Sequence, residues 1–213
     1  MKILGLFAAA ALVLGAHSAS AVTLTNGSFE NPIVGGSFAT YGNGSSSLDG
    51  WTIGGAGIDH IGNYWQASDG NQSLDLSALD AGSISQAISG LTVGQQYTVK
   101  FDLAGNPDGD DSVLKEVLVQ LDNNIATGQL YTFDTTGTSH GAMGWLTQAY
   151  VFIATASTQT LAFVSLTPGS FGPALDNVSV AATPIPGAIL LFGSALGGMG
   201  FLGYRRKKLA AAA

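Results

Sequence analysis

Residues 97–103 read Tyr-Thr-Val-Lys-Phe-Asp-Leu, and this stretch decides the fold class. Apolar side chains occupy every second position, with Thr98, Lys100 and Asp102 between them. Successive side chains of a β-strand point to opposite faces, so the alternation predicts a strand with one buried face and one face in water.

The surrounding sequence has the same character. Residues 161–166 are apolar on both alternating sets of positions, which predicts a central strand buried on both faces. Similar short runs predict strands at 73–76, 83–88, 117–121, 130–133, 145–154 and 174–180. Turns rich in Gly, Asn, Asp and Ser separate these runs, and no capped amphipathic helix of useful length lies among them. The pattern predicts an all-β protein, an antiparallel β-sandwich or jelly roll. The Gly/Ser-rich residues 35–50 are predicted to form a long surface loop.

The N-terminus has the layout of a secretory signal peptide. Lys2 precedes an apolar run over residues 3–16, and Ala19-Ser20-Ala21 supplies small residues for a peptidase. We therefore expect residues 1–21 to be removed after Ala21.

The C-terminus, residues 184–213, has the layout of a membrane anchor. Pro184 and Pro186 end the preceding domain, because proline interrupts both strands and helices. Residues 185–204 carry no charged side chain and have the length of a transmembrane helix. The basic residues 205–208 follow at once, which predicts a cytoplasmic end.

The region between these ends, residues 22–183, is predicted to be one exported and strongly acidic domain. It contains all fourteen acidic residues and only two of the seven basic ones, so its formal net charge is −12. Nucleic acid is excluded as a partner, because its phosphates require Lys and Arg. Divalent cations or neutral polymers fit better, and solubility is the alternative reason for the charge. Cysteine is absent, so disulfides and thiol chemistry play no part.

The C-terminal segment resembles the PEP-CTERM sorting signals of exopolysaccharide-producing Gram-negative bacteria. Its core has the Pro-x-Pro-x-Ala form of Pro184, Pro186 and Ala188, and its basic cluster begins with Arg205 and Arg206. The resemblance implies recognition by the membrane transpeptidase exosortase and removal of the helix. The protein would pass through the inner membrane transiently and reach the cell surface or extracellular matrix. An ordinary C-terminal membrane anchor is the alternative.

The domain itself resembles the choice-of-anchor C family. The resemblance rests on motifs spread over residues 22–183: Asn-Gly-Ser-Phe-Glu at 26–30, Gly-Trp at 50–51, Ile-Asp at 58–59, Tyr-Trp at 64–65, Ser-Leu-Asp-Leu at 73–76, Ala-Gly-Asn-Pro at 104–107 and Gly-Pro-Ala-Leu-Asp-Asn-Val at 172–178. It implies a galactose-binding-like jelly roll that is joined to a surface anchor and has no catalytic activity.

The resemblance to jelly-roll carbohydrate-binding modules also implies a structural Ca²⁺ between the first and last strands, held by Glu30 and Asp176. Ca²⁺ takes six to eight oxygen ligands, which carboxylates and main-chain carbonyls supply. The alternative is that both carboxylates only bond backbone amides. A second acidic cluster, Asp108-Gly109-Asp110-Asp111, lacks the spacing of a calcium loop and is predicted to be a solvated turn.

Residues 59–69 have the composition of a sugar-binding site. A pyranose face stacks on an exposed aromatic ring, while its hydroxyls pair with amides and carboxylates. We therefore predict carbohydrate-binding roles for Asp59, Asn63, Tyr64, Trp65 and Asp69. Core packing is the alternative for the two aromatic residues, and it is the favoured interpretation for Trp51 and Trp145.

No catalytic motif surrounds His60 or His140, the two histidines of the domain, so the sequence predicts a non-enzyme. The predicted function is non-catalytic binding of polysaccharide. Two alternatives remain open: a self-associating structural matrix protein without a sugar site, and a polysaccharide hydrolase with an unrecognised site.

Overall fold

The alternating stretch at residues 97–103 forms the middle of β6 (Gln96–Gly105) in the computed structural model, which describes residues 22–109 and 113–183. Tyr97, Val99, Phe101 and Leu103 are buried, while Lys100 is exposed. β6 lies inside a sheet, hydrogen-bonded to a neighbouring strand on each side. The prediction of a strand with one buried face is confirmed, but the opposite face is only partly in water, because Asp102 is 6% exposed.

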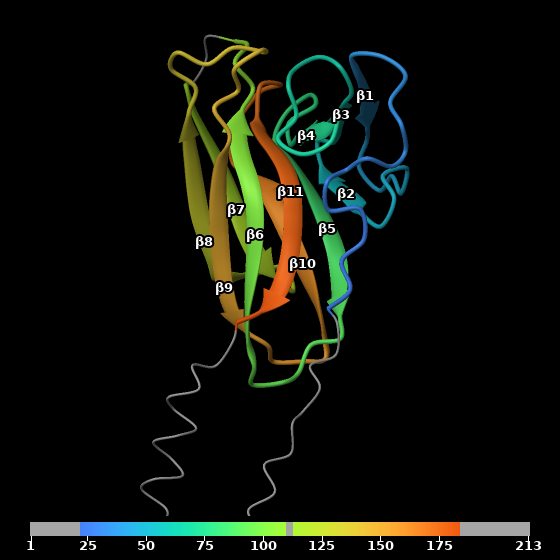
Figure 1. Ribbon diagram of the computed structural model, residues 1–213, viewed down its shortest axis with the longest axis vertical. Coiled ribbons are helices and arrows are strands. Elements are labelled where there is room, and N and C mark those ends of the chain that lie inside the picture. Colours follow the sequence, from blue (N-terminus) through green and yellow to red (C-terminus); the bar gives the residue numbers. More distant parts are fainter. Residues whose placement is uncertain (1–21, 110–112, 184–213) are drawn as a thin grey trace, which may run out of the picture.

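Two antiparallel sheets pack face to face (Figure 1). The six-stranded sheet has the order β1 (Phe38–Tyr41), β3 (Ile58–Ile61), β4 (Ser73–Asp75), β11 (Pro173–Ala182), β6 and β9 (Leu146–Ile153). The five-stranded sheet has the order β2 (Thr52–Gly55), β5 (Gly82–Ser89), β10 (Thr158–Ser165), β7 (Leu114–Leu121) and β8 (Asn124–Asp134). The all-β antiparallel sandwich is thus confirmed, and β10 is the central strand that its two-sided hydrophobicity predicts.

One predicted loop contains a strand. Residues 35–50 include β1, which pairs only with β3 and forms an edge of the six-stranded sheet. The Gly and Ser residues around this short segment hide its alternation in the sequence. Its pairing with β3, which neighbouring residues do not reveal, determines that it is a strand.

An aromatic cluster fills the space between the sheets. Trp51 lies 5.6 Å from Phe29 and 6.3 Å from Phe163, measured between ring centroids. Phe101 of the opposite sheet lies 5.2 Å from Phe163. Trp51 is therefore a core residue, as predicted.

Two tyrosines join the edge strands β8 and β9. The Tyr131 hydroxyl donates to the Ala149 carbonyl at 2.7 Å, and the Tyr150 hydroxyl donates to the Thr127 carbonyl at 2.7 Å. Burial raises the pKa of Tyr131 to about 12, so its hydroxyl remains a donor at neutral pH. The pair thereby satisfies carbonyls on the strand edges where the two sheets come together.

Three sequence predictions concern residues outside the described ranges. They are the signal peptide at 1–21, the sorting signal at 184–213, and Asp110 and Asp111 of the acidic cluster. Within residues 22–109 and 113–183, no helix is long and apolar enough to cross a membrane.

Candidate functional site

The connection between β3 and β4, residues 62–72, covers the outer face of the six-stranded sheet. Asp102 and Asp176 face each other in the register of β6 and β11, on the face opposite to the core residues Phe101 and Leu103. Both carboxylates accept hydrogen bonds from Ser68 in this connection. The connection therefore lies on the side of the sheet that faces away from its partner sheet.

Three carboxylates hold this connection in place. Asp176 Oδ2 accepts the N–H groups of Ser68 and Asp69, each at 2.8 Å. Asp102 Oδ2 accepts the Ser68 hydroxyl at 2.6 Å. Glu30 Oε1 accepts the N–H groups of Asn71 and Gln72, each at 2.8 Å. The backbone from 68 to 72 is thus fixed by side chains from three other segments.

The side chain of Gln72 fastens the same connection to the N-terminal segment. Its amide nitrogen donates to the carbonyls of Phe29 and Pro32, each at 3.0 Å, and its amide oxygen accepts the Val34 N–H. Gln72 is buried, so these bonds satisfy an amide that water does not reach.

The two anchoring aspartates differ in their titration. Burial raises the pKa of Asp176 to about 7, although the N–H groups of Asp69, Asn177 and Ser68 act in the opposite direction. Burial opposes ionisation of Asp102 as well, but hydrogen bonds from Ser68, Thr147 and Asn177 hold its pKa below the usual value.

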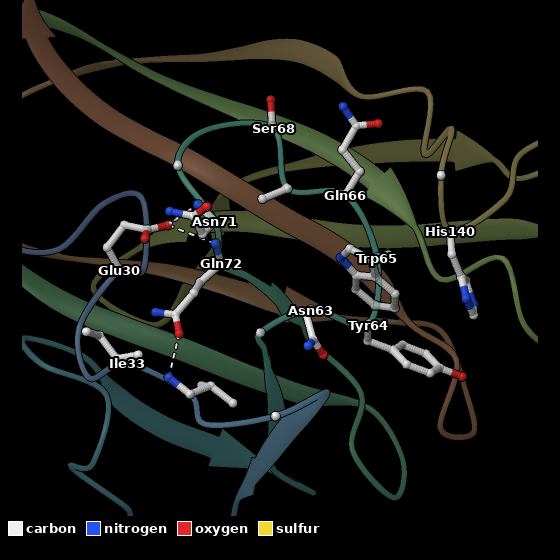
Figure 2. A pocket seen from close by; sticks show the side chains of 16 residues that line it. Glu30, Ile33, Asn63, Tyr64, Trp65, Gln66, Ser68, Asn71, Gln72 and His140 are labelled. Atoms are coloured by element: carbon white, nitrogen blue, oxygen red, sulfur yellow. Dashed lines mark hydrogen bonds between the residues drawn. The ribbon is translucent and has the colours of Figure 1, made fainter.

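An open groove of about 1010 Å³ lies above this connection (Figure 2). We call it the Tyr64 groove; residues 30–36, 62–72 and 140–141 supply its walls. Asn63, Gln66 and Asn71 are exposed, and their side-chain amides have no hydrogen-bond partner within the described part of the chain. The Tyr64 ring is half-buried. A groove of this size with an aromatic ring and free amides has the features of a ligand site.

Tyr64 belongs to a cluster with Asp108 and His140. Its hydroxyl donates to Asp108 Oδ2 at 2.7 Å, and His140 Nε2 lies 2.9 Å from the same oxygen. The ring centroids of Tyr64 and His140 are 4.5 Å apart. The hydrogen bond to Asp108 raises the pKa of Tyr64, so the phenol stays protonated.

This cluster adds contacts that the sequence did not reveal. Asp108 lies in the predicted turn between β6 and β7 and its side chain is 33% exposed, but its carboxylate also accepts a hydrogen bond from Tyr64 and contacts His140. His140 reaches the groove from the β8–β9 connection, and no local motif around it indicates this contact.

A second cavity of about 270 Å³ lies on the other side of Tyr64, which lines both cavities together with Trp65. We call it the Phe171 hollow. Phe38, Asp59, Asn106 and Phe171 are among its lining residues. Asp59 Oδ1 accepts the Thr40 hydroxyl at 2.6 Å, and burial raises the pKa of Asp59.

The structure separates the predicted sugar-binding residues. Asn63 and Tyr64 line the Tyr64 groove, and Asp59 lines the Phe171 hollow. Trp65 is only 5% exposed and donates its ring N–H to Ser73 Oγ at 2.8 Å, so it supports the floor and is not an exposed stacking surface. Asp69 lines neither cavity. Trp145 is half-buried, and its ring N–H donates to the Gln66 carbonyl at 2.9 Å.

The predicted calcium ligands, Glu30 and Asp176, both accept backbone N–H groups. Asp176 Oδ1 accepts the Asn177 N–H at 2.7 Å, in addition to the two bonds to its other oxygen. No three Asp, Glu, His or Cys side chains of the described residues gather as a metal would require. These contacts match the alternative interpretation, in which both carboxylates only bond backbone amides. N–H donors point at the oxygens that a cation would need. Calcium at this pair stays a prediction.

A two-sheet antiparallel sandwich with an open groove on its surface defines this protein as a jelly-roll domain with a candidate ligand site. The chain belongs to the DUF642 family, described as proteins of unknown function, whose model matches residues 22–181. Membership of the choice-of-anchor C family and the PEP-CTERM signal stay predictions.

One similar curated protein is Halomucin from Haloquadratum walsbyi. It is 30% identical over 182 residues, which are 81% of this chain and 2% of Halomucin. The chain thus spans about 2% of the length of this curated relative.

The solved structures that resemble this chain include carbohydrate-binding modules. A family 35 module from Clostridium thermocellum is 18% identical with a TM-score of 0.46, covering 68% of this chain and 98% of the module. A family 61 module solved with β-1,4-galactotriose is 14% identical with a TM-score of 0.44, covering 77% of this chain and 100% of the module. Similarity at this level does not identify a ligand for this chain.

Proposed function

We propose that the domain binds polysaccharide without catalysis, through the Tyr64 groove. The observation that carries the proposal is that the exposed amides of Asn63, Gln66 and Asn71 line the same groove as the half-exposed ring of Tyr64. Sugar C–H groups pack on an aromatic face, and amides both donate to and accept from sugar hydroxyls. An open groove suits a chain that extends beyond the site at both ends.

The carboxylates of the two cavities support a non-catalytic role. A glycosidase needs two carboxyl groups facing one glycosidic bond. Asp59 and Asp75 lie opposite each other on β3 and β4, but Asp75 is 1% exposed. Its oxygens accept N–H groups from Asn106, Ser77 and Gly172, so they hold the fold together and do not face a substrate.

The test is binding of the purified full chain to a panel of neutral polysaccharides and bacterial exopolysaccharides. Tyr64→Ala is expected to lower the affinity at least about ten-fold, because it removes the ring. Tyr64→Phe keeps the ring and is expected to retain most of the affinity.

Gln129→Ala is the matched control, since Gln129 is exposed on β8 and lines neither cavity. Unchanged binding by Tyr64→Ala, or no binding by the folded wild-type protein, would contradict the proposal. Concentration-dependent assembly without glycan binding would instead favour a self-associating matrix protein, and turnover of a polysaccharide would favour a hydrolase.

We further propose that the protein is exported, sorted by exosortase through the inner membrane, and presented at the cell surface or in the matrix. This proposal rests on the sequence at residues 1–21 and 184–213, around Pro184, Pro186, Ala188, Arg205 and Arg206. Mass spectrometry of the mature protein tests it: the chain should begin at Val22 and lack the basic residues 205–208. Retention of either end would contradict the corresponding step.

A further inference from the structure

The Phe171 hollow and the Tyr64 groove share a wall. Tyr64 and Trp65 line both cavities, so the Tyr64 ring is common to the two sites that a linear ligand would occupy in turn. Ligand pockets usually measure about 300–1,000 Å³. The groove, at about 1010 Å³, has room for several sugar units, whereas the hollow, at about 270 Å³, suits a single ring.

Two phenylalanines present apolar surface around the hollow. Phe38 is 49% exposed and Phe171 is 36% exposed, although large apolar side chains usually avoid water. The Phe38 ring lies edge-on to Tyr64, with 5.8 Å between the centroids. Phe171 packs against Gly109, where any added Cβ would collide with its ring. Each ring therefore has a packing contact that restrains it where it lines the hollow, as an aromatic surface for a sugar requires.

Asp59 is a polar group in the hollow that is available to a ligand. One of its oxygens accepts the Thr40 hydroxyl, and the other has no hydrogen-bond partner among the described residues. The Asn106 side chain, by contrast, is already engaged at both of its polar atoms: its amide nitrogen donates to Asp75, and its oxygen accepts the Asp108 N–H. Asp59 is thus placed to accept a hydrogen bond from a sugar hydroxyl in a partly desolvated site.

Charge restricts which sugar enters. Asp59 and Asp108 are the carboxylates of the hollow that are not fully buried, and the described lining contains no Lys or Arg. Lys100 and Lys115 lie on β6 and β7 and line neither cavity. His140 contacts Asp108 from the groove side. A carboxylate or sulfate on the ligand would meet like charges in a site with reduced access to water.

We propose that the Phe171 hollow is a second sugar subsite, which takes an uncharged sugar unit of the same chain that occupies the Tyr64 groove. The inference rests on the proposed function and extends it. The ligand is then a neutral glycan that crosses Tyr64, and its affinity depends on its length.

Oligosaccharide ladders of two to six units test this subsite with the full chain. The probes are β-1,4-linked galactose, β-1,4-linked glucose and β-1,3-linked glucose, and the series that binds best is carried forward. Phe171→Ala is expected to lower the affinity for the hexasaccharide about ten-fold and to leave that for the disaccharide within about two-fold. Ile125→Ala is the control, because Ile125 is exposed on β8 and lines neither cavity.

A second measurement examines charge. Oligogalacturonates of the same lengths are expected to bind at least about ten-fold more weakly than neutral oligomers at low salt. Asp59→Asn should reduce this difference, whereas Glu116→Gln, which removes a charge on the other sheet, should not.

The outcomes separate the two proposals. An equal loss at every length for Phe171→Ala, no loss, or oligogalacturonates binding as well as neutral oligomers would overturn the second subsite while glycan binding through Tyr64 stands. Absence of binding by every oligomer and polymer would overturn the proposed function and the subsite together.

Discussion

At the scale of single residues, Asp75 shows how the fold holds a carboxyl group away from water. Its Oδ1 accepts the N–H groups of Ser77 at 2.9 Å and Gly172 at 3.1 Å, and its Oδ2 accepts the Asn106 amide at 2.7 Å. Burial nevertheless raises its pKa from 3.8 to about 7. Between these pH values the folded state binds a proton that the unfolded state has released, so the folded state is stabilised at acid pH and loses this contribution as pH rises towards 7.

Asp75→Asn should reveal this linkage. A single group in this window changes the free energy of unfolding by about 1.4 kcal/mol per pH unit. The wild-type protein is therefore expected to lose stability relative to Asp75→Asn by about that amount per unit between pH 5 and pH 7. Urea unfolding at each pH measures it. Loss of a carboxylate oxygen as an acceptor lowers the stability of the variant equally at every pH. The quantity to compare is therefore the slope of the unfolding free energy against pH in the two proteins.

The titration of His60 changes stability with pH in the opposite direction to that of Asp75. It is buried, its Nε2 lies 2.6 Å from the Phe29 carbonyl, and burial lowers its pKa, so the folded protein keeps it neutral. Stability from this group is lost as pH falls below 6.5, the value of the unfolded state. Wild type and Asp75→Asn share this effect, so it cancels in their difference. Equal slopes in the two proteins would contradict a proton held by Asp75.

At the scale of elements, the β3–β4 connection depends on carboxylates that belong to other segments. Glu30 precedes the first strand, while Asp102 and Asp176 lie on β6 and β11. Their bonds to residues 68–72 fix a backbone that makes no strand ladder of its own there. In the proposed site, the backbone of Asn71 is thereby positioned before a ligand arrives, which reduces the entropy that binding would cost.

Asp102→Asn is expected to loosen this connection. Loss of charged hydrogen bonds to Ser68 and Thr147 should lower the unfolding free energy by about 2 kcal/mol. Amide hydrogen exchange should rise mainly in residues 66–72, and glycan affinity should fall several-fold. Hydrogen exchange with mass spectrometry measures the first effect. Asp134→Asn is the control, because Asp134 is exposed and bonds only within its own turn. Exchange that rises equally in β10 would show a general effect on the sandwich instead.

At the scale of the whole molecule, the domain is strongly acidic. Residues 22–183 have a formal charge of −12, and their two lysines, Lys100 and Lys115, both lie outside the two cavities.

The described chain begins and ends at one end of the sandwich, away from the β3–β4 and β8–β9 connections (Figure 1). A protein tethered through these ends would present its groove outwards.

The melting temperature should therefore depend on salt. Raising NaCl from 0.01 to 0.15 M shortens the Debye length from about 30 to about 8 Å, which weakens repulsion among the carboxylates and should raise the melting temperature.

Calorimetry at constant ionic strength then compares the effects of Ca²⁺ and Mg²⁺ on the melting temperature. A rise specific to Ca²⁺ that Glu30→Gln abolishes would support the predicted ion at Glu30 and Asp176. Equal rises in melting temperature with both cations would show that charge screening alone accounts for the effect and would contradict a specific Ca²⁺ site.

The period-two pattern predicted β4 to β11, because each contains enough alternating or continuous apolar residues to show which face is buried. β1, β2 and β3, of four residues each, are absent from that prediction, and those of β1 lie among glycines and serines. The site was predictable only where it is local. Asn63 and Tyr64 were found because polar and aromatic residues cluster around them, whereas Phe38, Asp108, His140 and Phe171 come from four other segments without a shared motif.

The sequence alone determined the fold class, the acidic character of the domain and the stretch that carries the groove, because hydrophobic periodicity and composition are properties of neighbouring residues. Only the tertiary structure decided that Trp65 is buried while Tyr64 remains accessible, and that Glu30, Asp102 and Asp176 bond the β3–β4 connection. The physical reason is that these environments arise between segments distant along the chain. The burial of a ring, or the donors around a carboxylate, depends on strand register and on which connection covers which face.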